Sequence, residues 1–183
     1  MLRIVVTGSE STGKTTLARD LAHALHAPWV AEYARDYAVA RSRVLTAHDV
    51  EPIAHGQMAR EDAAVLGAGG APLIVLDTDL VSTTVYADAY YGACPQWIMG
   101  ESRTRLGSLY LLCSIDLPWQ ADGVRDQPQA RDNMQGRFDA RLRDLEARVL
   151  PVAGTGPARL SAALAAVRGW LTATGNSWRA GPG

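Results

Sequence analysis

Residues 2–15 read LRIVVTGSESTGKT, and this stretch decides the fold of the 183-residue chain. The apolar run at 2–7 is typical of a short buried strand, and the pattern GxxxxGK(S/T) follows it directly at 8–15. Glycines in this pattern let backbone N–H groups turn inward around phosphates, and the helix that follows points its positive end at them. The sequence therefore predicts a phosphate-binding loop (P-loop) between a strand and a helix.

The P-loop residues are expected to bind ATP together with Mg²⁺. Lys14 would bridge the terminal phosphates, and the Thr15 hydroxyl would coordinate the metal. Composition singles out Lys14, because 17 of the 18 basic residues are arginine and Lys14 is the one lysine. The full set of expected nucleotide contacts is Gly8, Ser9, Glu10, Ser11, Thr12, Gly13, Lys14, Thr15 and Thr16.

Length and composition bound the remaining possibilities. A net charge of -1 disfavours a nucleic-acid partner, which usually requires a markedly basic surface. No apolar run approaches the roughly 18 residues of a membrane span, and the first residues do not resemble a signal peptide. Cys94 and Cys113 form neither a disulfide framework nor a metal-ligand spacing. We expect a cytoplasmic domain without membrane insertion, and the oligomeric state stays open.

Apolar runs alternate with helical patterns along the chain, which predicts an α/β fold. We expect the three-layer sandwich of the P-loop kinases, a five-stranded parallel sheet with helices on both faces. One domain would span 1–173, with a polar, arginine-dotted lid at about 116–136 and a frayed tail at 174–183. Strands are expected at 2–7, 28–32, 73–77, 109–115 and 149–153, and helices at 14–26, 33–44, 47–66, 80–91, 96–106, 137–148 and 158–173.

The class of P-loop protein follows from what the chain lacks. Regulatory GTPases read guanine with an Asn-Lys-x-Asp motif, which needs a second lysine. Large ATPase motors need a longer chain. A short chain with a lid-like insert favours a small-molecule kinase, so we expect a phosphotransferase.

Several motifs resemble one family of such kinases. They are GSESTGKTTLA at 8–18, EYAR at 32–35, DTD at 77–79, YYG at 90–92 with CP at 94–95, and IDLPW at 115–119 with DGVR at 122–125. In this order they resemble the ribosylnicotinamide kinase domain of the NadR type. The resemblance implies ATP-dependent phosphorylation of the 5′-hydroxyl of nicotinamide riboside, which yields nicotinamide mononucleotide for NAD biosynthesis. The four histidines form no HxGH motif, so we expect no adenylyltransferase activity.

One departure leaves the nucleoside open. Bifunctional relatives carry a Trp directly before the Glu of EYAR, where this chain has Ala31; Trp29, on the same face of a strand, is the candidate replacement. A kinase for another nucleoside is therefore an alternative. A nucleotide-dependent regulatory module is a further alternative, with hydrolysis that needs no acceptor.

Three carboxylates fall near strand ends, at the sheet edge where open α/β folds bind ligands. Glu32 could accept the proton of the sugar hydroxyl, or form an ion pair with Arg35. Asp77 is expected to hold Mg²⁺ or contact the attacking hydroxyl. Asp79 could act in catalysis and substrate binding, or cap the next helix. The sequence does not decide which of the three is the base.

The remaining candidates are long side chains. Arg125 and Arg131 lie in the predicted lid, where an arginine that closes over the phosphates would stabilise migrating charge. Arg35, Gln57 and Tyr86 are candidate nucleoside contacts. Their alternatives are an ion pair, a solvated helix face and aromatic packing.

Overall fold

Five parallel strands form one sheet in the order β2-β3-β1-β4-β5, in a computed structural model that describes residues 1–118 and 131–176. This confirms the predicted sheet, with the strand that precedes the P-loop at its centre. The strands are β1 (Leu2–Thr7), β2 (Trp29–Val30), β3 (Leu73–Asp77), β4 (Leu109–Cys113) and β5 (Val149–Val152).

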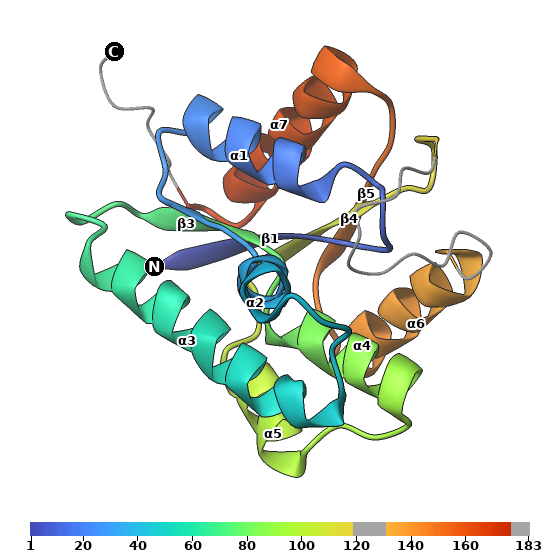
Figure 1. Ribbon diagram of the computed structural model, residues 1–183. Helices are drawn as coiled ribbons and strands as arrows, with labels where there is room; N and C mark the ends of the chain where they lie inside the picture. Colours follow the sequence, from blue (N-terminus) through green and yellow to red (C-terminus); the bar gives the residue numbers. More distant parts are fainter. Residues whose placement is uncertain (119–130, 177–183) are drawn as a thin grey trace.

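Helices cover both faces of the sheet (Figure 1). Helices α1 and α7 pack together on one face, while α3, α4 and α6 cover the other and α5 packs outside α3 and α4. The helices are α1 (Lys14–Ala24), α2 (Tyr33–Arg41), α3 (Val50–Leu66), α4 (Leu80–Tyr91), α5 (Gln96–Thr104), α6 (Arg131–Asp144) and α7 (Gly156–Ala173), with a 3₁₀ turn η1 (Ala47–Asp49) before α3.

The core divides along the pleat of the strands. In β1, Ile4 and Val6 point into the apolar cluster beneath α1 and α7, and Val5 points into the cluster beneath α4 and α6. Because both faces are covered, β1, β3 and β4 are runs of apolar residues without polar alternation.

The predicted start of α6 is wrong. The helix begins at Arg131 and not at 137, so residues 131–136 of the predicted lid are helical. Its first turns are polar, but Met134, Phe138 and Leu142 recur every fourth residue and are buried against the sheet. Most of the remaining lid prediction, at 119–130, lies outside the described residues, as does most of the tail prediction. Within the described part of the chain, no helix combines the length and apolar character of a membrane span.

Candidate active site

The P-loop adopts a turn that needs glycine at both ends. Gly8 has φ of 130°, and a Cβ there would lie 3.0 Å from the carbonyl oxygen of Cys113. Gly13 has φ of 75° and precedes the first turn of α1. No described side chain caps that turn, so its N–H groups are available to an anion. The local backbone thus has the geometry that the motif predicts.

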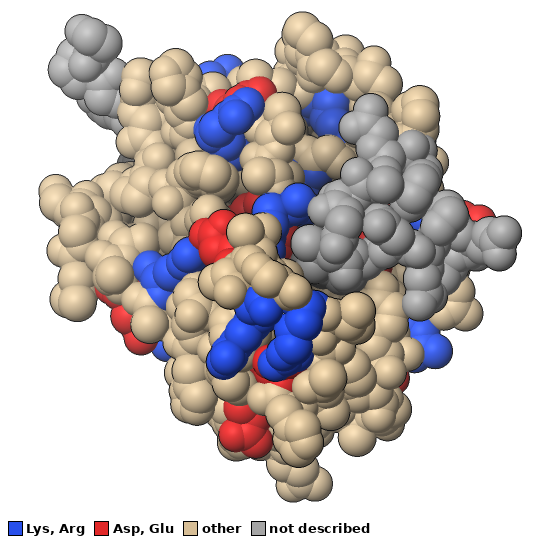
Figure 2. All heavy atoms as spheres, in the orientation of Figure 1, with Lys and Arg blue, Asp and Glu red and all other residues tan. Residues whose placement is uncertain are grey.

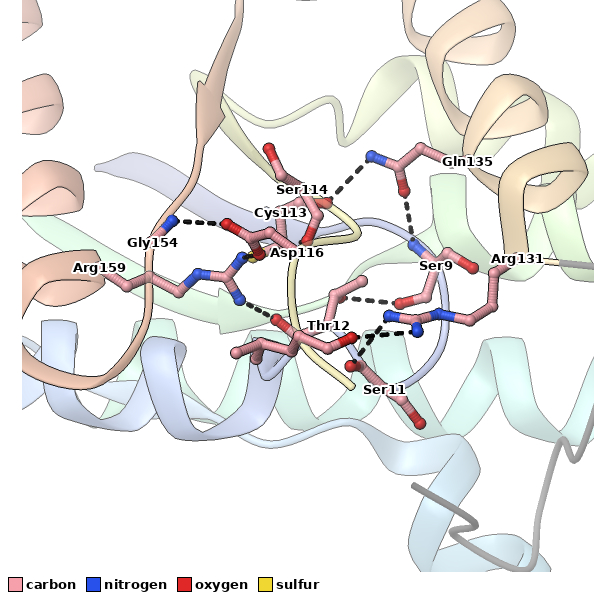
Figure 3. A network of polar contacts seen from close by, with 11 residues as sticks. Ser9, Ser11, Thr12, Cys113, Ser114, Asp116, Arg131, Gln135, Gly154 and Arg159 are labelled. Atoms are coloured by element: carbon pink, nitrogen blue, oxygen red, sulfur yellow. Dashed lines mark hydrogen bonds and ion pairs between the residues drawn. The ribbon is translucent and has the colours of Figure 1, made fainter. Parts of the chain in front are cut away.

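Helix α6 holds the first half of the P-loop in place (Figure 3). The Ser9 N–H donates to the side-chain oxygen of Gln135 at 3.0 Å, and the Gln135 amide donates to the Cys113 carbonyl at 3.0 Å. Arg131 donates to the carbonyl oxygen of Ser11 at 3.3 Å and to that of Leu117 at 3.1 Å. Arg131 is therefore bound to the backbone around the phosphate site, which differs from the predicted contact with phosphate.

Helix α7 holds the second half through Arg159, which sequence analysis missed. Its guanidinium donates to the Thr12 carbonyl, to the Ser114 carbonyl at 3.1 Å and to the Asp116 carboxylate (Figure 3). Asp116 also accepts from the Gly154 N–H at 2.6 Å. Arg159 is buried, and it joins the P-loop to the segments that follow β4 and β5. No local sequence signal separates it from the other arginines.

A cavity of about 560 Å³ opens over the P-loop. Lys14, Thr15 and Thr16 line it from α1, and Arg35 and Arg159 add two guanidinium groups. The Lys14 ammonium donates to the Ser9 carbonyl at 2.7 Å, which places it over the loop. This nucleotide cavity has the cations and the backbone N–H groups that a polyphosphate needs.

A second cavity, of about 320 Å³, lies between α2, α3 and α4. Its wall is largely apolar and aromatic, with Tyr86, Tyr90 and Tyr91 on α4 and Val44 and Leu45 opposite. Among the described residues that line it, Glu32 alone is charged. We call this space the acceptor cavity.

Glu32 and Arg35 lie where the two cavities approach each other. Glu32 lines the acceptor cavity, Arg35 lines the nucleotide cavity, and the Arg35 Nε lies 4.0 Å from the Glu32 carboxylate.

Gln57 fixes the start of α2, because its side-chain oxygen accepts from the Tyr33 N–H at 2.9 Å. Figure 2 shows basic and acidic side chains interspersed on the face over α2, without one continuous basic patch.

Asp77 ends β3 beside the P-loop, with 1% of its surface exposed. Burial, and then the charge of Glu32, raises its pKa to about 6, while Thr15, Lys14 and Arg35 act in the opposite direction. Neither carboxylate oxygen accepts a hydrogen bond of normal geometry from the described residues. A buried carboxylate without a full hydrogen bond, close to the Thr15 hydroxyl, fits the oxygen ligands of Mg²⁺.

Asp79 occupies the second of the two positions expected for it, as the N-cap of α4. Its carboxylate caps α4 by accepting from the N–H groups of Val81 at 3.0 Å and Ser82 at 3.4 Å. The Tyr110 hydroxyl donates to it at 2.5 Å. Thr78, with φ of 65°, turns the chain between the two aspartates. Asp79 lines neither cavity, and burial raises its pKa to about 7.

Of the other predicted substrate contacts, some line the acceptor cavity and others do not. Gln57 and Tyr86 line the acceptor cavity, and their role as nucleoside contacts stays a prediction. Trp29 lines neither cavity and is 39% exposed on the short edge strand β2, so it is not placed to stack on a bound base. Arg125 lies outside the described residues.

Comparison with known proteins identifies related sequences. The AAA domain family matches residues 3–159. The trifunctional NAD biosynthesis/regulator protein NadR of Escherichia coli (strain K12) is 29% identical over 136 residues, which are 72% of this chain and 33% of that protein. The same protein of Salmonella typhimurium is 31% identical over 126 residues, 67% of this chain and 30% of its own length. The chain thus spans about a third of these curated relatives.

Solved structures share the fold. A NadR protein in complex with NR superposes with a TM-score of 0.74 at 25% identity, over 92% of this chain and 50% of the other. A NadR protein in complex with NAD and AMP-PNP gives 0.72 at 26%, over 92% and 49%. Thymidylate kinase from Ehrlichia chaffeensis gives 0.66 over 93% and 98%, and at 12% identity it supports the fold alone.

Replacing the lysine tests the nucleotide cavity. We expect Lys14→Ala to weaken binding of MgATP at least about tenfold, because a charge-assisted contact to phosphate contributes about 1.5–3 kcal/mol. Isothermal titration calorimetry measures the change. Arg143→Ala removes an exposed cation of α6 that lines neither cavity, and it should leave the affinity unchanged. Equal affinity in Lys14→Ala and wild type would contradict the assignment of this cavity.

Asp77→Asn should stabilise the protein at neutral pH. The raised pKa means that the folded state binds the Asp77 proton more tightly than the unfolded chain, so stability falls as pH rises from about 4 to about 6 and stays lower above. Asparagine cannot ionise, so we expect about 1–3 kcal/mol of added stability at pH 7.5 and about a third of that gain at pH 4.5.

Urea denaturation at the two pH values measures this difference. Asp139→Asn, on the exposed side of α6, is the control and should change the unfolding free energy by less than about 0.5 kcal/mol at both. The same gain for Asp77→Asn at both pH values would show that ionisation of Asp77 is not its cause.

Proposed function

The chain belongs to the AAA domain family, and on that premise we propose that it is an ATP-dependent nucleoside kinase that converts nicotinamide riboside into nicotinamide mononucleotide. The NadR relatives support the substrate, since one solved NadR protein is in complex with NR and another with NAD and AMP-PNP. The P-loop and its cavity support ATP as the phosphate donor.

The meeting of two cavities at Glu32 and Arg35 carries this proposal. A kinase must bring an acceptor hydroxyl to the terminal phosphate of ATP in a geometry that allows in-line attack. The acceptor cavity presents a carboxylate at this point, and the nucleotide cavity presents a guanidinium about 4.0 Å away. A base and a cation are thus held side by side between the two substrate sites.

The chemistry follows from these positions. Glu32 accepts the proton of the 5′-hydroxyl while the 5′-oxygen of the nucleoside forms a bond to the γ-phosphorus of ATP. The bond between that phosphorus and the oxygen that bridges it to the β-phosphate breaks, and ADP leaves. Lys14 and Arg35 stabilise the negative charge that moves onto the β-phosphate of the departing ADP. Thr15 and Asp77 would hold Mg²⁺, which, when bound, neutralises charge on the β- and γ-phosphates.

The acceptor cavity favours a nucleoside over a nucleotide. A nucleoside monophosphate would bring about two negative charges into a space whose described lining has no Lys or Arg and one carboxylate, Glu32. The nicotinamide ring of the riboside is cationic, and the faces of Tyr86 and Tyr90 offer it aromatic contact. This charge preference distinguishes the cavity from one that would accept a thymidylate.

The described lining of the acceptor cavity does not select one nucleobase. Trp29 is not placed to contact it, so ring recognition would depend on the tyrosines of α4, which tolerate other aromatic bases. A kinase for another nucleoside is therefore the second candidate. A regulatory module would instead hydrolyse ATP at a rate independent of any nucleoside.

Substituting the proposed base tests the mechanism. We expect Glu32→Gln to lower kcat about 10²- to 10⁴-fold with little change in the KM for ATP, because the amide cannot accept the proton. A coupled assay of ADP release measures both. Glu51→Gln, which changes an exposed carboxylate on α3, is the control. A near-wild-type rate in Glu32→Gln would move the base to Asp77.

A substrate panel tests the acceptor. We expect nicotinamide riboside to stimulate ADP release, and the monophosphates nicotinamide mononucleotide and thymidylate to give less than about a hundredth of that rate, because an unpaired phosphate in this cavity costs several kcal/mol. Preference for another nucleoside would keep the mechanism and change the substrate. Equal release with no acceptor would favour the regulatory module.

A further inference from the structure

Glu10 is a carboxylate inside a loop that binds phosphates. The N–H groups of the loop surround a bound phosphate. A negative charge in the loop would repel that phosphate, and the repulsion grows as the distance between the two charges shortens. Glu10 is nevertheless buried, with 6% of its surface exposed. Something must therefore hold its carboxylate away from the phosphate position.

Two hydroxyl groups hold this carboxylate. The Tyr90 hydroxyl donates to one oxygen at 2.8 Å, and the Ser9 hydroxyl donates to the other at 2.9 Å. Glu10 lines neither the nucleotide cavity nor the acceptor cavity. Of the two donors, Ser9 belongs to the loop itself and Tyr90 comes from α4.

Tyr90 also belongs to the acceptor cavity. Its ring lines that cavity and stacks on Tyr86, with centroids 5.9 Å apart and an angle of 11° between the rings. Tyr86 in turn meets the edge of the buried Phe138 on α6 at 5.5 Å. The ring of Tyr90 therefore borders the acceptor cavity, while its hydroxyl reaches Glu10 in the P-loop.

We propose that Tyr90 is a positioning residue that joins the acceptor cavity to the P-loop by holding the Glu10 carboxylate away from the ATP phosphates. A nucleoside that packs on the ring will fix Tyr90 in this position, so it will strengthen nucleotide binding. By reciprocity, the nucleotide will strengthen nucleoside binding by the same factor. The first statement, that Tyr90 holds Glu10 away from the phosphates, depends only on the P-loop. The second statement, that a nucleoside and the nucleotide strengthen each other's binding, rests on the proposed function.

Binding of AMP-PNP with Mg²⁺ to the full chain tests the first statement. We expect Tyr90→Phe to lower the affinity about five- to tenfold, because Phe keeps the ring and removes only the donor to Glu10. Tyr37→Phe is the matched control: the Tyr37 hydroxyl donates to the buried Asp49 at 2.9 Å, and both residues lie outside the two cavities. An affinity within twofold of wild type for Tyr90→Phe would overturn the proposal.

A second background separates repulsion from a general loss of structure. In Glu10→Gln the side chain has no negative charge, so adding Tyr90→Phe should cost less than twofold in AMP-PNP affinity. This non-additivity is the signature of an interaction between the two side chains. A full five- to tenfold loss in the Glu10→Gln background would show that Tyr90 acts by another route and would overturn the proposal.

Nicotinamide riboside at saturation tests the second statement. We expect it to increase AMP-PNP affinity in the wild type and to do so at least threefold less in Tyr90→Phe. If both ligands bind but the riboside does not change AMP-PNP affinity, the coupling is overturned. If the riboside does not bind, the proposed function fails, while the comparison of Tyr90→Phe with Tyr37→Phe still decides the role of Tyr90.

Discussion

The outward carbonyl groups of the P-loop impose the constraint on which the rest of the site depends. When backbone N–H groups turn inward to face an anion, the carbonyl groups of the same turn face the protein, and buried carbonyls need donors. Arg131 and Arg159 supply these donors to Ser11 and Thr12. Helices α6 and α7 are thereby fixed to the loop, so distant parts of the chain determine the shape of the phosphate site.

The carboxyl edge of the sheet positions the two aspartates of the site. Thr78, a β-branched residue in the left-handed region, directs Asp77 toward the P-loop and Asp79 into the cap of α4. Such backbone strain costs of the order of 1–3 kcal/mol and persists where the surrounding structure holds it. The charge of Asp77 adds a further cost of burial. The residues that carry these costs, Thr78 and Asp77, are next to each other at the candidate active site. Such costs are expected where a site is organised for chemistry and not for stability.

The P-loop and the five-stranded parallel sheet could be predicted from the sequence, because each depends on local pattern. GxxxxGK(S/T) encodes a backbone turn, and an apolar run followed by Asp77 marks the end of a buried strand. Arg159 and Gln135 could not be recognised, since their P-loop partners are backbone atoms more than a hundred residues away. The argument for Trp29 relies on alternation along a strand, but β2 is only two residues long and ends before Ala31, so alternation does not fix how Trp29 lies relative to Ala31.

The lone lysine has a practical consequence. Within these 183 residues, Lys14 has the only side-chain amine, and it lies over the P-loop. A reagent that acylates amines therefore reports on one side chain at the centre of the nucleotide cavity, together with the α-amino group of the chain. Mass spectrometry of the labelled protein would follow nucleotide occupancy directly, without an engineered probe, because bound phosphates shield that amine.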